Sequence, residues 1–358
     1  MTADRVRIAI VGCGKIAQTH AAALAEIPEA ELVACCDQDE QRANDLASQY
    51  GVPDCTADLD GLLGSGKVDA ILVCVPHPIH ERVVVAAANA GVHALCEKPI
   101  ATSLEEADRM ISAHDWAGTT FGVIFQRRFW PAAQRIRQAI DSGRLGTPTF
   151  GECSARIWRS SEYFGSDPWR GKWATEGGGV LMNQAVHAID QFLWFMGNPV
   201  EVVGRYATLV HGDYIDVEDT AVATVLFESG ALGVINASST FTTNLGFRVA
   251  INGSSGEAVS VWENPEGTQG VNELWTFAGE EELRLAWDQK DRGNPGFPGF
   301  HRNQIQEFVQ SILAGRPPAV TGRDGLRSLE VILAIYESSR TGLPVQLPMQ
   351  RSGVPIQP

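Results

Sequence analysis

The chain has 358 residues, of which 44% are hydrophobic and 20% are charged, a composition typical of a globular protein with two domains. Its formal net charge of −15 repels polyanions, so we expect no nucleic-acid partner and no anionic membrane partner. The sequence shows no signal peptide and no apolar run near the roughly 20 residues that span a bilayer, and we expect a cytoplasmic protein.

The first 124 residues alternate between short apolar runs and segments with helical spacing. Apolar runs predict strands at 7–11, 31–36, 70–75, 92–96 and 120–124, and helical spacing predicts helices at 14–27, 40–50, 79–90 and 104–116. Continuous apolar strands between amphipathic helices indicate a parallel sheet covered on both faces. We therefore expect an α/β protein whose N-terminal domain, 1–124, is a doubly wound Rossmann fold.

After residue 124 the pattern of apolar and polar residues changes. We expect helices at 131–141 and 178–196 around a strand at 149–157, and helices at 303–314 and 326–341 near the end. Between Val200 and about Trp287, apolar and polar residues alternate, which predicts an antiparallel sheet with one packed face. The second domain, 125–346, is thus expected to be an α+β domain with a large, mostly antiparallel, open-faced sheet, followed by a tail at 347–358.

The cysteines indicate a reducing compartment. There are seven, an odd number that includes no CxxC pair, and six of them lie in the first hundred residues, mostly in apolar runs. Small buried thiols in the cytosol explain this pattern, and we expect no metal site.

Residues 12–17 form a GxGxxA pattern that follows the first predicted strand and opens a helix. Gly12 allows a tight turn, Gly14 lets the backbone approach a pyrophosphate, and Ala17 keeps helix and strand close, while the peptide groups around Lys15 and Ile16 begin the helix that faces the phosphates. A glycine-rich turn without a ligand is the alternative interpretation.

Asp37 ends the second predicted strand, 25 residues after Gly12. A carboxylate there accepts hydrogen bonds from the adenosine ribose and repels a 2′-phosphate, which favours NAD over NADP. Arg42 lies close enough in sequence to soften that preference.

Two later strand ends are expected at the same edge of the sheet, where open parallel sheets bind their ligands. The first places Val75, Pro76, His77 and His80 near the cofactor, although the prolines could simply stop the strand and start the next helix. The second reads Glu97-Lys98-Pro99. Because Pro99 disfavours the helical region for the residue before it, Lys98 should be extended and project toward a nicotinamide; the alternative is a solvated lysine before the next helix.

A second polar cluster lies in GGGVLMNQAVHAID at 177–190. If this segment is helical from about Gly179, then Asn183, His187 and Asp190 share one face at i, i+4 and i+7. Three glycines at the helix start indicate close approach of a ligand or of another backbone. A solvent-exposed polar face, or a core histidine satisfied by a carboxylate, is the alternative.

Together these motifs resemble the Gfo/Idh/MocA oxidoreductase family over nearly the whole chain. The resemblance rests on GxGxxA, on EKP at 97–99, on GGGxLxxxxxHxxD at 177–190 and on VEDTAVATVLFESGALG at 217–233. The loop from Tyr163 to Trp173, with the Met-Asn-Gln run before the histidine, resembles the branch of UDP-N-acetylglucosaminuronate 3-dehydrogenases and related sugar dehydrogenases.

The resemblance implies roles for individual residues. Lys98 is the expected catalytic lysine, and His187 is expected to contact the substrate hydroxyl as acid/base. Many members have Asp four residues before that histidine; here Asn183 can hydrogen-bond but cannot titrate, and it is expected to orient the sugar. The resemblance also implies cofactor contacts from Glu97, Lys98, Gln126, Trp169 and Arg170, and substrate contacts from Lys98, Arg128, Trp173, Asn183 and His187. Trp169 and Trp173 could equally be core aromatics.

The expected activity is hydride transfer between a sugar CH–OH and NAD, with either His187 or Lys98 as the base. The alternatives are a dihydrodiol-type dehydrogenase, another reductase or an NAD-using glycosidase on the same scaffold, and a non-catalytic NAD-sensing regulator. The resemblance further implies a homodimer or homotetramer formed through the second-domain sheet. The sequence does not identify the sugar, the carbon oxidised or the physiological direction.

Overall fold

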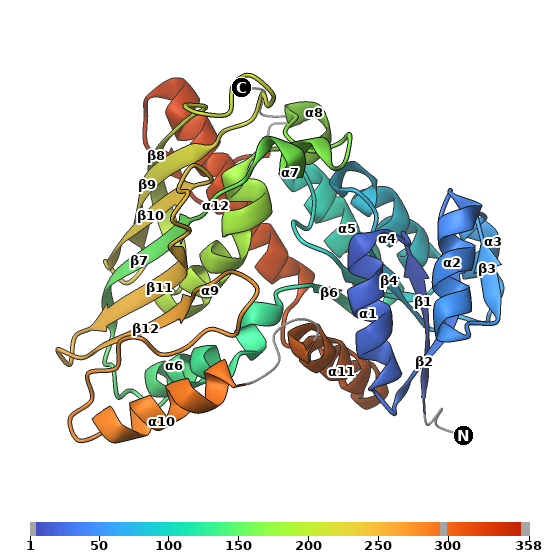
Figure 1. Cartoon of the computed structure of the whole chain (residues 1–358), viewed down its shortest axis with the longest axis horizontal. Coiled ribbons are helices and arrows are strands. Elements are labelled where there is room, and N and C mark those ends of the chain that lie inside the picture. Colours follow the sequence, from blue (N-terminus) through green and yellow to red (C-terminus); the bar gives the residue numbers. More distant parts are fainter. Residues whose placement is uncertain (1–4, 294–298, 352–358) are drawn as a thin grey trace. The chain divides into compact units, whose positions relative to one another are not determined.

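The computed structural model describes residues 5–293 and 299–351 of the chain. The chain divides into two compact units, one of residues 1–126 with 297–326 and the other of residues 127–296 with 327–358 (Figure 1). The first boundary lies two residues beyond the expected one, at Gln126. The return of the chain to the first unit near its end differs from the expected second domain, which included that segment.

The first unit contains a six-stranded parallel sheet with strand order β3-β2-β1-β4-β5-β6, which is the expected Rossmann topology. Its strands are β1 Val6–Val11, β2 Ala30–Cys36, β3 Asp54–Thr56, β4 Ala70–Val73, β5 His93–Cys96 and β6 Phe121–Val123. Its helices are α1 Lys15–Ala25, α2 Glu40–Tyr50, α3 Leu59–Gly64, α4 His80–Asn89, α5 Leu104–Ala117 and α11 Gly299–Ala314, and the short turn η1 covers His77–Ile79.

Helix α11 belongs to the first unit because its apolar face is part of that core. Ile305 and Phe308 are buried in the same cluster as Ile8 of β1 and Leu24 of α1. The Gln304 side chain also donates to the carbonyl oxygen of Val123, the last residue of β6, at 2.7 Å, and accepts from the backbone N–H of Phe125 at 2.9 Å. No sequence pattern predicts these contacts. The packing of an amphipathic helix against a surface distant in sequence is a tertiary property, which the sequence pattern does not show.

The second unit is built on a seven-stranded sheet with order β12-β11-β7-β10-β9-β8-β13. Only the β7–β10 pair is parallel, so the expectation of a mostly antiparallel sheet is confirmed. The strands are β7 Pro148–Arg156, β8 Pro199–Ala207, β9 Thr220–Phe227, β10 Leu232–Ser238, β11 Gly246–Gly253, β12 Ala258–Glu263 and β13 Val345–Gln346. The helices are α6 Pro131–Asp141, α7 Ser161–Gly165, α8 Trp173–Glu176, the π-helix η3 Val180–Ala185, α9 Val186–Met196, α10 Glu281–Arg292 and α12 Gly322–Thr341, of which α12 begins in the first unit; the short turn η2 covers Gln126–Phe129 at the boundary.

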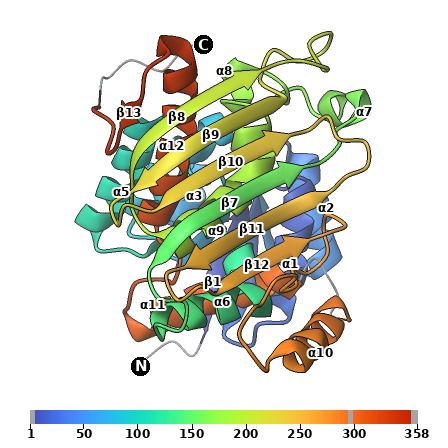
Figure 2. The ribbon, with the colours of Figure 1, turned by 90° about the vertical axis from the view of Figure 1, so that its left-hand side faces the viewer.

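The two faces of this sheet differ. On one face α9 packs closely, and a methyl group at Gly151 or Gly233 would lie within 2.7 Å of the Phe192 side chain. Figure 2 shows no helix of the described residues in front of the other face. Neighbouring strands expose Phe150, Val222 and Leu232 on that face. The expected open-faced sheet is therefore present.

Two sequence predictions in this unit were wrong. Alternating strands were expected up to about Trp287, but the last strand of that run ends at Glu263 and α10 follows. Acidic residues in the first turn of α10 and basic residues in its last turn complement the helix dipole, and this charge pattern could have predicted the helix. The expected single helix at 178–196 begins instead with the π-helix η3.

No helix in residues 5–293 and 299–351 is long and apolar enough to cross a membrane.

Candidate active site

The glycine-rich turn of the first unit has the geometry that a dinucleotide site needs. Gly12 has φ of +91°, and a methyl group there would lie 2.6 Å from the backbone carbonyl carbon of Cys74, so only glycine fits. A methyl group at Gly14, in contrast, would have no heavy atom within 4 Å. Helix α1 starts directly after Gly14 with no side-chain cap and no acidic residue in its first turn. Its N-terminus can therefore receive a phosphate group.

Asp37 follows β2 and holds this turn in place. Its Oδ2 accepts from the backbone N–H of Cys13 at 2.7 Å, and its Oδ1 accepts from the N–H of Asp39 at 2.9 Å. A carboxylate has about four lone-pair positions, so acceptor capacity remains for ribose hydroxyls. The Arg42 guanidinium forms an ion pair with the carboxylate of Asp39, at 3.3 Å.

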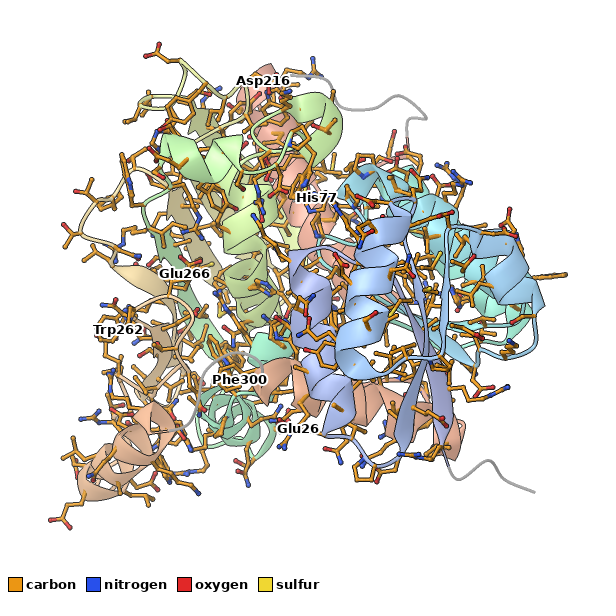
Figure 3. The ribbon with its side chains drawn as sticks, turned by 45° about the vertical axis from the view of Figure 1, so that its right-hand side comes forward. Glu26, His77, Asp216, Trp262, Glu266 and Phe300 are labelled. Atoms are coloured by element: carbon orange, nitrogen blue, oxygen red, sulfur yellow. The ribbon has the colours of Figure 1, made fainter. Side chains whose placement is uncertain are left out.

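Two histidines, His77 and His80, follow β4. His77 lies in η1, where Figure 3 labels it, and it is 7% exposed. The His80 ring has no exposed surface; its Nδ1 lies 3.0 Å from the carbonyl oxygen of Pro99, and its Nε2 lies 3.0 Å from that of Val75. The ring thus joins the ends of β4 and β5. We no longer expect His80 to present a polar atom to a cofactor, which corrects the sequence interpretation.

Lys98 follows β5 and is held by a buried ion pair that the sequence analysis missed. Glu97 accepts from the Nε2 of His20 in α1 at 2.7 Å, and its other oxygen accepts from the backbone N–H of Lys98 at 3.2 Å. Burial raises the pKa of Glu97, but the hydrogen bond and charge of His20 outweigh it and lower the pKa to about 2. The His301 ring meets His20 edge-on at 5.2 Å, and burial lowers the pKa of His301 to about 3. Glu97 therefore supports Lys98 through the backbone.

The parallel sheet brings these parts to one edge. Strands β1, β4 and β5 are neighbours, so the Gly12–Ala17 turn, the loop of His77 and the Lys98 loop all leave the carboxyl edge of the same sheet. This is the edge at which open α/β sheets bind ligands.

In the second unit, the glycine run at 177–179 lies against buried polar groups. Glu218 accepts from the N–H of Gly179 at 2.7 Å, from that of Leu181 at 2.9 Å, and from the Tyr336 hydroxyl at 2.9 Å. A methyl group at Gly179 would lie 1.9 Å from the Glu218 carbonyl oxygen, which explains the glycine. Burial raises the pKa of Glu218 to about 7, against the lowering effect of its hydrogen bonds. This carboxyl group fixes the start of η3.

The π-helix changes how the polar cluster is displayed. Asn183 lies in η3, whereas His187 and Asp190 lie in α9, so the expected regular i, i+4, i+7 face is wrong. His187 is 8% exposed. Both carboxylate oxygens of Asp190 accept from the Arg128 guanidinium, at 2.7 and 2.6 Å, and both side chains are buried. This ion pair uses two of the five N–H donors of the guanidinium, and a substrate contact of Arg128 stays a prediction.

The loop before the glycine run surrounds Tyr163. The Arg170 guanidinium lies 4.5 Å from the ring centres of both Tyr163 and Trp169, and its Nη1 donates to the Tyr163 hydroxyl at 2.5 Å. Trp173 is partly buried and packs against Tyr206 and Tyr336, and its substrate contact stays a prediction.

Glu176 was not singled out in the sequence. It is buried at the end of α8, and its carboxylate accepts from the Asn183 side-chain amide. Two features of the sequence could have indicated Glu176 as a site residue. It directly precedes the glycine run, and it is an acidic residue next to the helix that carries the expected substrate residues.

Gln126 ends the first unit and is buried; its Oε1 has no hydrogen-bond partner among the residues described. Within residues 5–293 and 299–351, no group of three or more His, Cys, Asp or Glu residues is arranged to hold a metal ion.

Both parts of the chain match models of one oxidoreductase family. A family model described as "Oxidoreductase family, NAD-binding Rossmann fold" matches residues 6–125, and one described as "Oxidoreductase family, C-terminal alpha/beta domain" matches residues 137–347. The myo-inositol 2-dehydrogenase of Thermotoga maritima is 29% identical over 96% of this chain and 98% of its own. The D-glucoside 3-dehydrogenase of Escherichia coli is 26% identical over 97% and 99%. Among solved structures, the WlbA dehydrogenase from Bordetella pertussis, in complex with NADH and UDP-GlcNAcA, is 30% identical, with a TM-score of 0.87 over 98% of this chain and 100% of its own.

Proposed function

Because this chain belongs to the Gfo/Idh/MocA oxidoreductase family, we propose that it is an NAD-dependent dehydrogenase acting on a secondary hydroxyl of a sugar or sugar derivative. The observation that carries the proposal lies in the first unit. An uncapped helix N-terminus with open space at Gly14 shares one sheet edge with Lys98, which gives the phosphate site and the expected reactive lysine a common ligand position.

The residues present fit NAD. The peptide groups of Gly12–Ala17 would hold the pyrophosphate, and Asp37 would accept from the adenosine ribose. The Asp37 carboxylate repels a 2′-phosphate, which favours NAD over NADP. Val75, Pro76 and His77, at the end of β4, would border the cofactor, and we propose Gln126, Trp169 and Arg170 for its nicotinamide half.

The chemistry requires one proton and one hydride to leave the alcohol. Bound NAD supplies the hydride acceptor. We propose that His187 takes the hydroxyl proton, since an imidazole can do so near neutral pH, while the Lys98 ammonium donates a hydrogen bond to the oxygen as it becomes a carbonyl. Asn183 would hold a substrate hydroxyl. In the reverse direction the same groups return the proton to the oxygen.

The substrate class follows from the relatives. Their names include dehydrogenases of inositols and of D-glucosides, and the WlbA structure contains a nucleotide sugar. A cyclic polyol, a sugar or a nucleotide sugar is the class we propose here. The described cysteines are all free and mostly buried, which fits a reducing cytoplasm.

We also propose that the open sheet face associates with a second copy, giving a homodimer or homotetramer. Phe150, Val222 and Leu232 are 44%, 54% and 59% exposed on that helix-free face, which is unusual for large apolar side chains grouped together. Light scattering should give a dimer or larger, and Leu232→Glu should shift the mass to a monomer. A wild-type protein that is monomeric at micromolar concentration would contradict this assignment.

The activity is tested by following NAD reduction with a panel of inositols, aldoses, glucosides and nucleotide sugars. At least one should reduce NAD, and Lys98→Ala and His187→Ala should each lower kcat by about 100-fold or more while leaving the Kd for NADH within a few fold. A wild-type protein that binds neither NAD(H) nor NADP(H), or full turnover in both variants, would refute the proposal. Binding of NADH without turnover on any substrate would favour a sensor.

A further inference from the structure

A cavity in the first unit lies away from the dinucleotide turn. Its volume is about 430 Å³, which is typical of a small-molecule site, and every residue that lines it belongs to the first unit. His93 and Phe121, the first residues of β5 and β6, are part of the lining. Because β1, β4, β5 and β6 run parallel, the cavity lies at the amino edge of the sheet, whereas the Gly12–Ala17 turn and Lys98 leave the carboxyl edge.

The cavity is formed between two segments that are distant in sequence. One is the C-terminal half of α5 with the residues that follow it, and the other is the connection 315–321 between α11 and α12. An antiparallel bridge between Gly122 and Thr321 holds this connection against β6. Pro317 and Pro318 restrict its backbone. The fold therefore fixes both sides of the cavity before any ligand binds.

Part of the lining is apolar and flat. Ile111, Phe121 and Ile312 contribute apolar side chains. The His114 ring, which also lines the cavity, stacks on Phe121 with 4.9 Å between the ring centres and 16° between their planes. Burial lowers the pKa of His114 to about 4, so this ring is neutral at neutral pH. The apolar part of the lining therefore suits a flat, uncharged group.

His93 contributes a hydrogen-bond donor whose position the backbone determines. The N–H of Thr120 donates to the His93 Nδ1 at 2.8 Å, so a neutral His93 ring carries its proton on Nε2. Burial lowers the pKa of His93, which favours the neutral ring. The carboxylate of Asp69, whose charge acts on His93, already accepts three hydrogen bonds from Arg7. Within residues 5–293 and 299–351, the His93 Nε2 has no hydrogen-bond partner.

Two exposed arginines add further donors. The Nη1 of Arg316 donates to Glu307 at 2.6 Å, and the Nη2 of Arg323 donates to Asp115 at 2.6 Å. Each guanidinium has five N–H donors, so donors remain on both arginines. The Arg316 and Arg323 side chains are 47% and 68% exposed, and exposed ion pairs contribute little free energy. A ligand anion can therefore replace Asp115 on Arg323.

We propose that this cavity is a second ligand site, which binds an organic anion with a flat apolar body and a carboxylate or phosphate group. The body packs against the apolar lining around Phe121. The anion accepts from Arg316, Arg323 and the His93 Nε2, because these donors exceed what their protein partners use. Asp115 competes with the anion for Arg323. The site is separate from the proposed dehydrogenase site and does not depend on that function.

Methyl NMR spectra can locate the bound ligand. Ile111 and Ile312 line the cavity, while Ile16 lies in the phosphate turn, and a valine substitution at each position identifies its methyl signal. Naphthoate, a flat aromatic carboxylate, should shift the Ile111 and Ile312 signals and leave that of Ile16 in place, with a Kd below about 1 mM. Neutral naphthalenemethanol and inorganic phosphate should each bind at least about tenfold more weakly, since each lacks one half of the recognised chemistry.

AMP provides the second source of the same chemistry, a flat base with a phosphate. Its Kd is read at the Ile111 and Ile312 signals, so that binding at the dinucleotide turn, which shifts Ile16, is not counted. A lower Kd for AMP than for naphthoate would identify a nucleotide as the ligand class, and the reverse would identify an aromatic acid.

Two sets of substitutions should act in opposite directions. Arg316→Gln combined with Arg323→Gln should raise the Kd for naphthoate at least about tenfold, because both charged donors are removed. Asp115→Asn removes the competing carboxylate and should lower the Kd by about two- to fivefold. Arg109→Gln is the matched control, since Arg109 is an exposed arginine of α5 that pairs with Glu81 at 2.9 Å and does not line the cavity. Its Kd should equal the wild-type value, and an unchanged Tm shows that each variant is folded.

The proposal fails if millimolar naphthoate leaves the Ile111 and Ile312 signals in place, or if naphthalenemethanol binds as tightly as naphthoate. It also fails if the double arginine variant and Arg109→Gln have the same Kd. NADH titration of the same samples, followed at Ile16, tests the proposed function separately, because a protein without NADH binding can still bind naphthoate in the cavity.

Discussion

Gly12 and Gly14 are two residues apart in the same turn, yet the structure predicts different consequences for a methyl group at each. At Gly12, the positive φ costs a non-glycine residue about 1–2 kcal/mol, and contact of the new methyl group with the Cys74 backbone at 2.6 Å adds about 1–3 kcal/mol of overpacking. Gly12→Ala should therefore destabilise the first unit by about 2–5 kcal/mol.

Gly14→Ala should behave in the opposite way. Its φ is −78°, and the new methyl group meets nothing within 4 Å, so the stability loss should stay below about 1 kcal/mol, the weaker helix-capping preference of alanine being the main contribution. The methyl group would stand where the pyrophosphate must approach. We expect the Kd for NADH to rise by at least about tenfold, since the displaced phosphate contacts are charge-assisted.

Thermal unfolding and NADH titration of both variants form the assay. At roughly 2–4 °C per kcal/mol for a domain of this size, Gly12→Ala should lower the Tm by about 4 °C or more, while Gly14→Ala should change the Tm little and lose NADH affinity. Each variant serves as the control for the other. A Gly14→Ala protein with wild-type NADH affinity would refute the assignment of the phosphate site, and a Gly12→Ala protein with wild-type Tm would refute the packing argument.

Other predictions concern the buried carboxyl groups. The pKa of Glu97 is lowered to about 2, so its contribution to stability is present above its ordinary pKa of 4.5 and is lost as pH falls toward 2. Glu97→Gln should therefore reduce the pH dependence of the free energy of unfolding in urea between pH 4.5 and pH 2. An unchanged pH dependence would contradict the pairing with His20. The pKa of Glu218 is raised to about 7, so the folded state binds an extra proton and stability should fall as pH rises from 4.5 to 7. Burial raises the pKa of Glu263 to about 7 as well, so Glu218→Gln should weaken this dependence without abolishing it, and an unchanged slope would contradict the raised pKa of Glu218. Tyr336→Phe removes a hydrogen bond to Glu218 and should destabilise the second unit by about 1 kcal/mol in the same assay, with a loss below about 0.3 kcal/mol arguing against the contact.

The sequence was most informative where local pattern and chemistry coincide. The apolar runs predicted the ends of β1, β2, β4 and β5 to within two residues. The GxGxxA pattern predicted the turn, because glycines between a strand and a helix are typical of the dinucleotide-binding turn. It also selected Lys98, Asn183 and His187 as candidates from short motifs. None of these inferences needed contacts between distant residues.

Partners of the polar groups were decided only by tertiary structure. The sequence did not show the bidentate pair of Arg128 with Asp190, which lies 62 positions away. His80 looked like a cofactor contact until its ring was found between the carbonyls of Val75 and Pro99. The type of a side chain says which bonds it can make, whereas its partner depends on which strands become neighbours.

The sequence by itself determined the Rossmann sheet, the position of the phosphate turn and the chemical character of the candidate residues, because these follow from periodicity and from residue types close together in the chain. Tertiary structure alone decided that α11 belongs to the first unit, that η3 breaks the helical register at Asn183, and that Glu97 and Glu176 lie behind Lys98 and Asn183. Burial is the physical reason: a carboxylate removed from water must find donors wherever the fold supplies them, and here the fold supplies them from His20 for Glu97 and from Gly171 and Asn183 for Glu176.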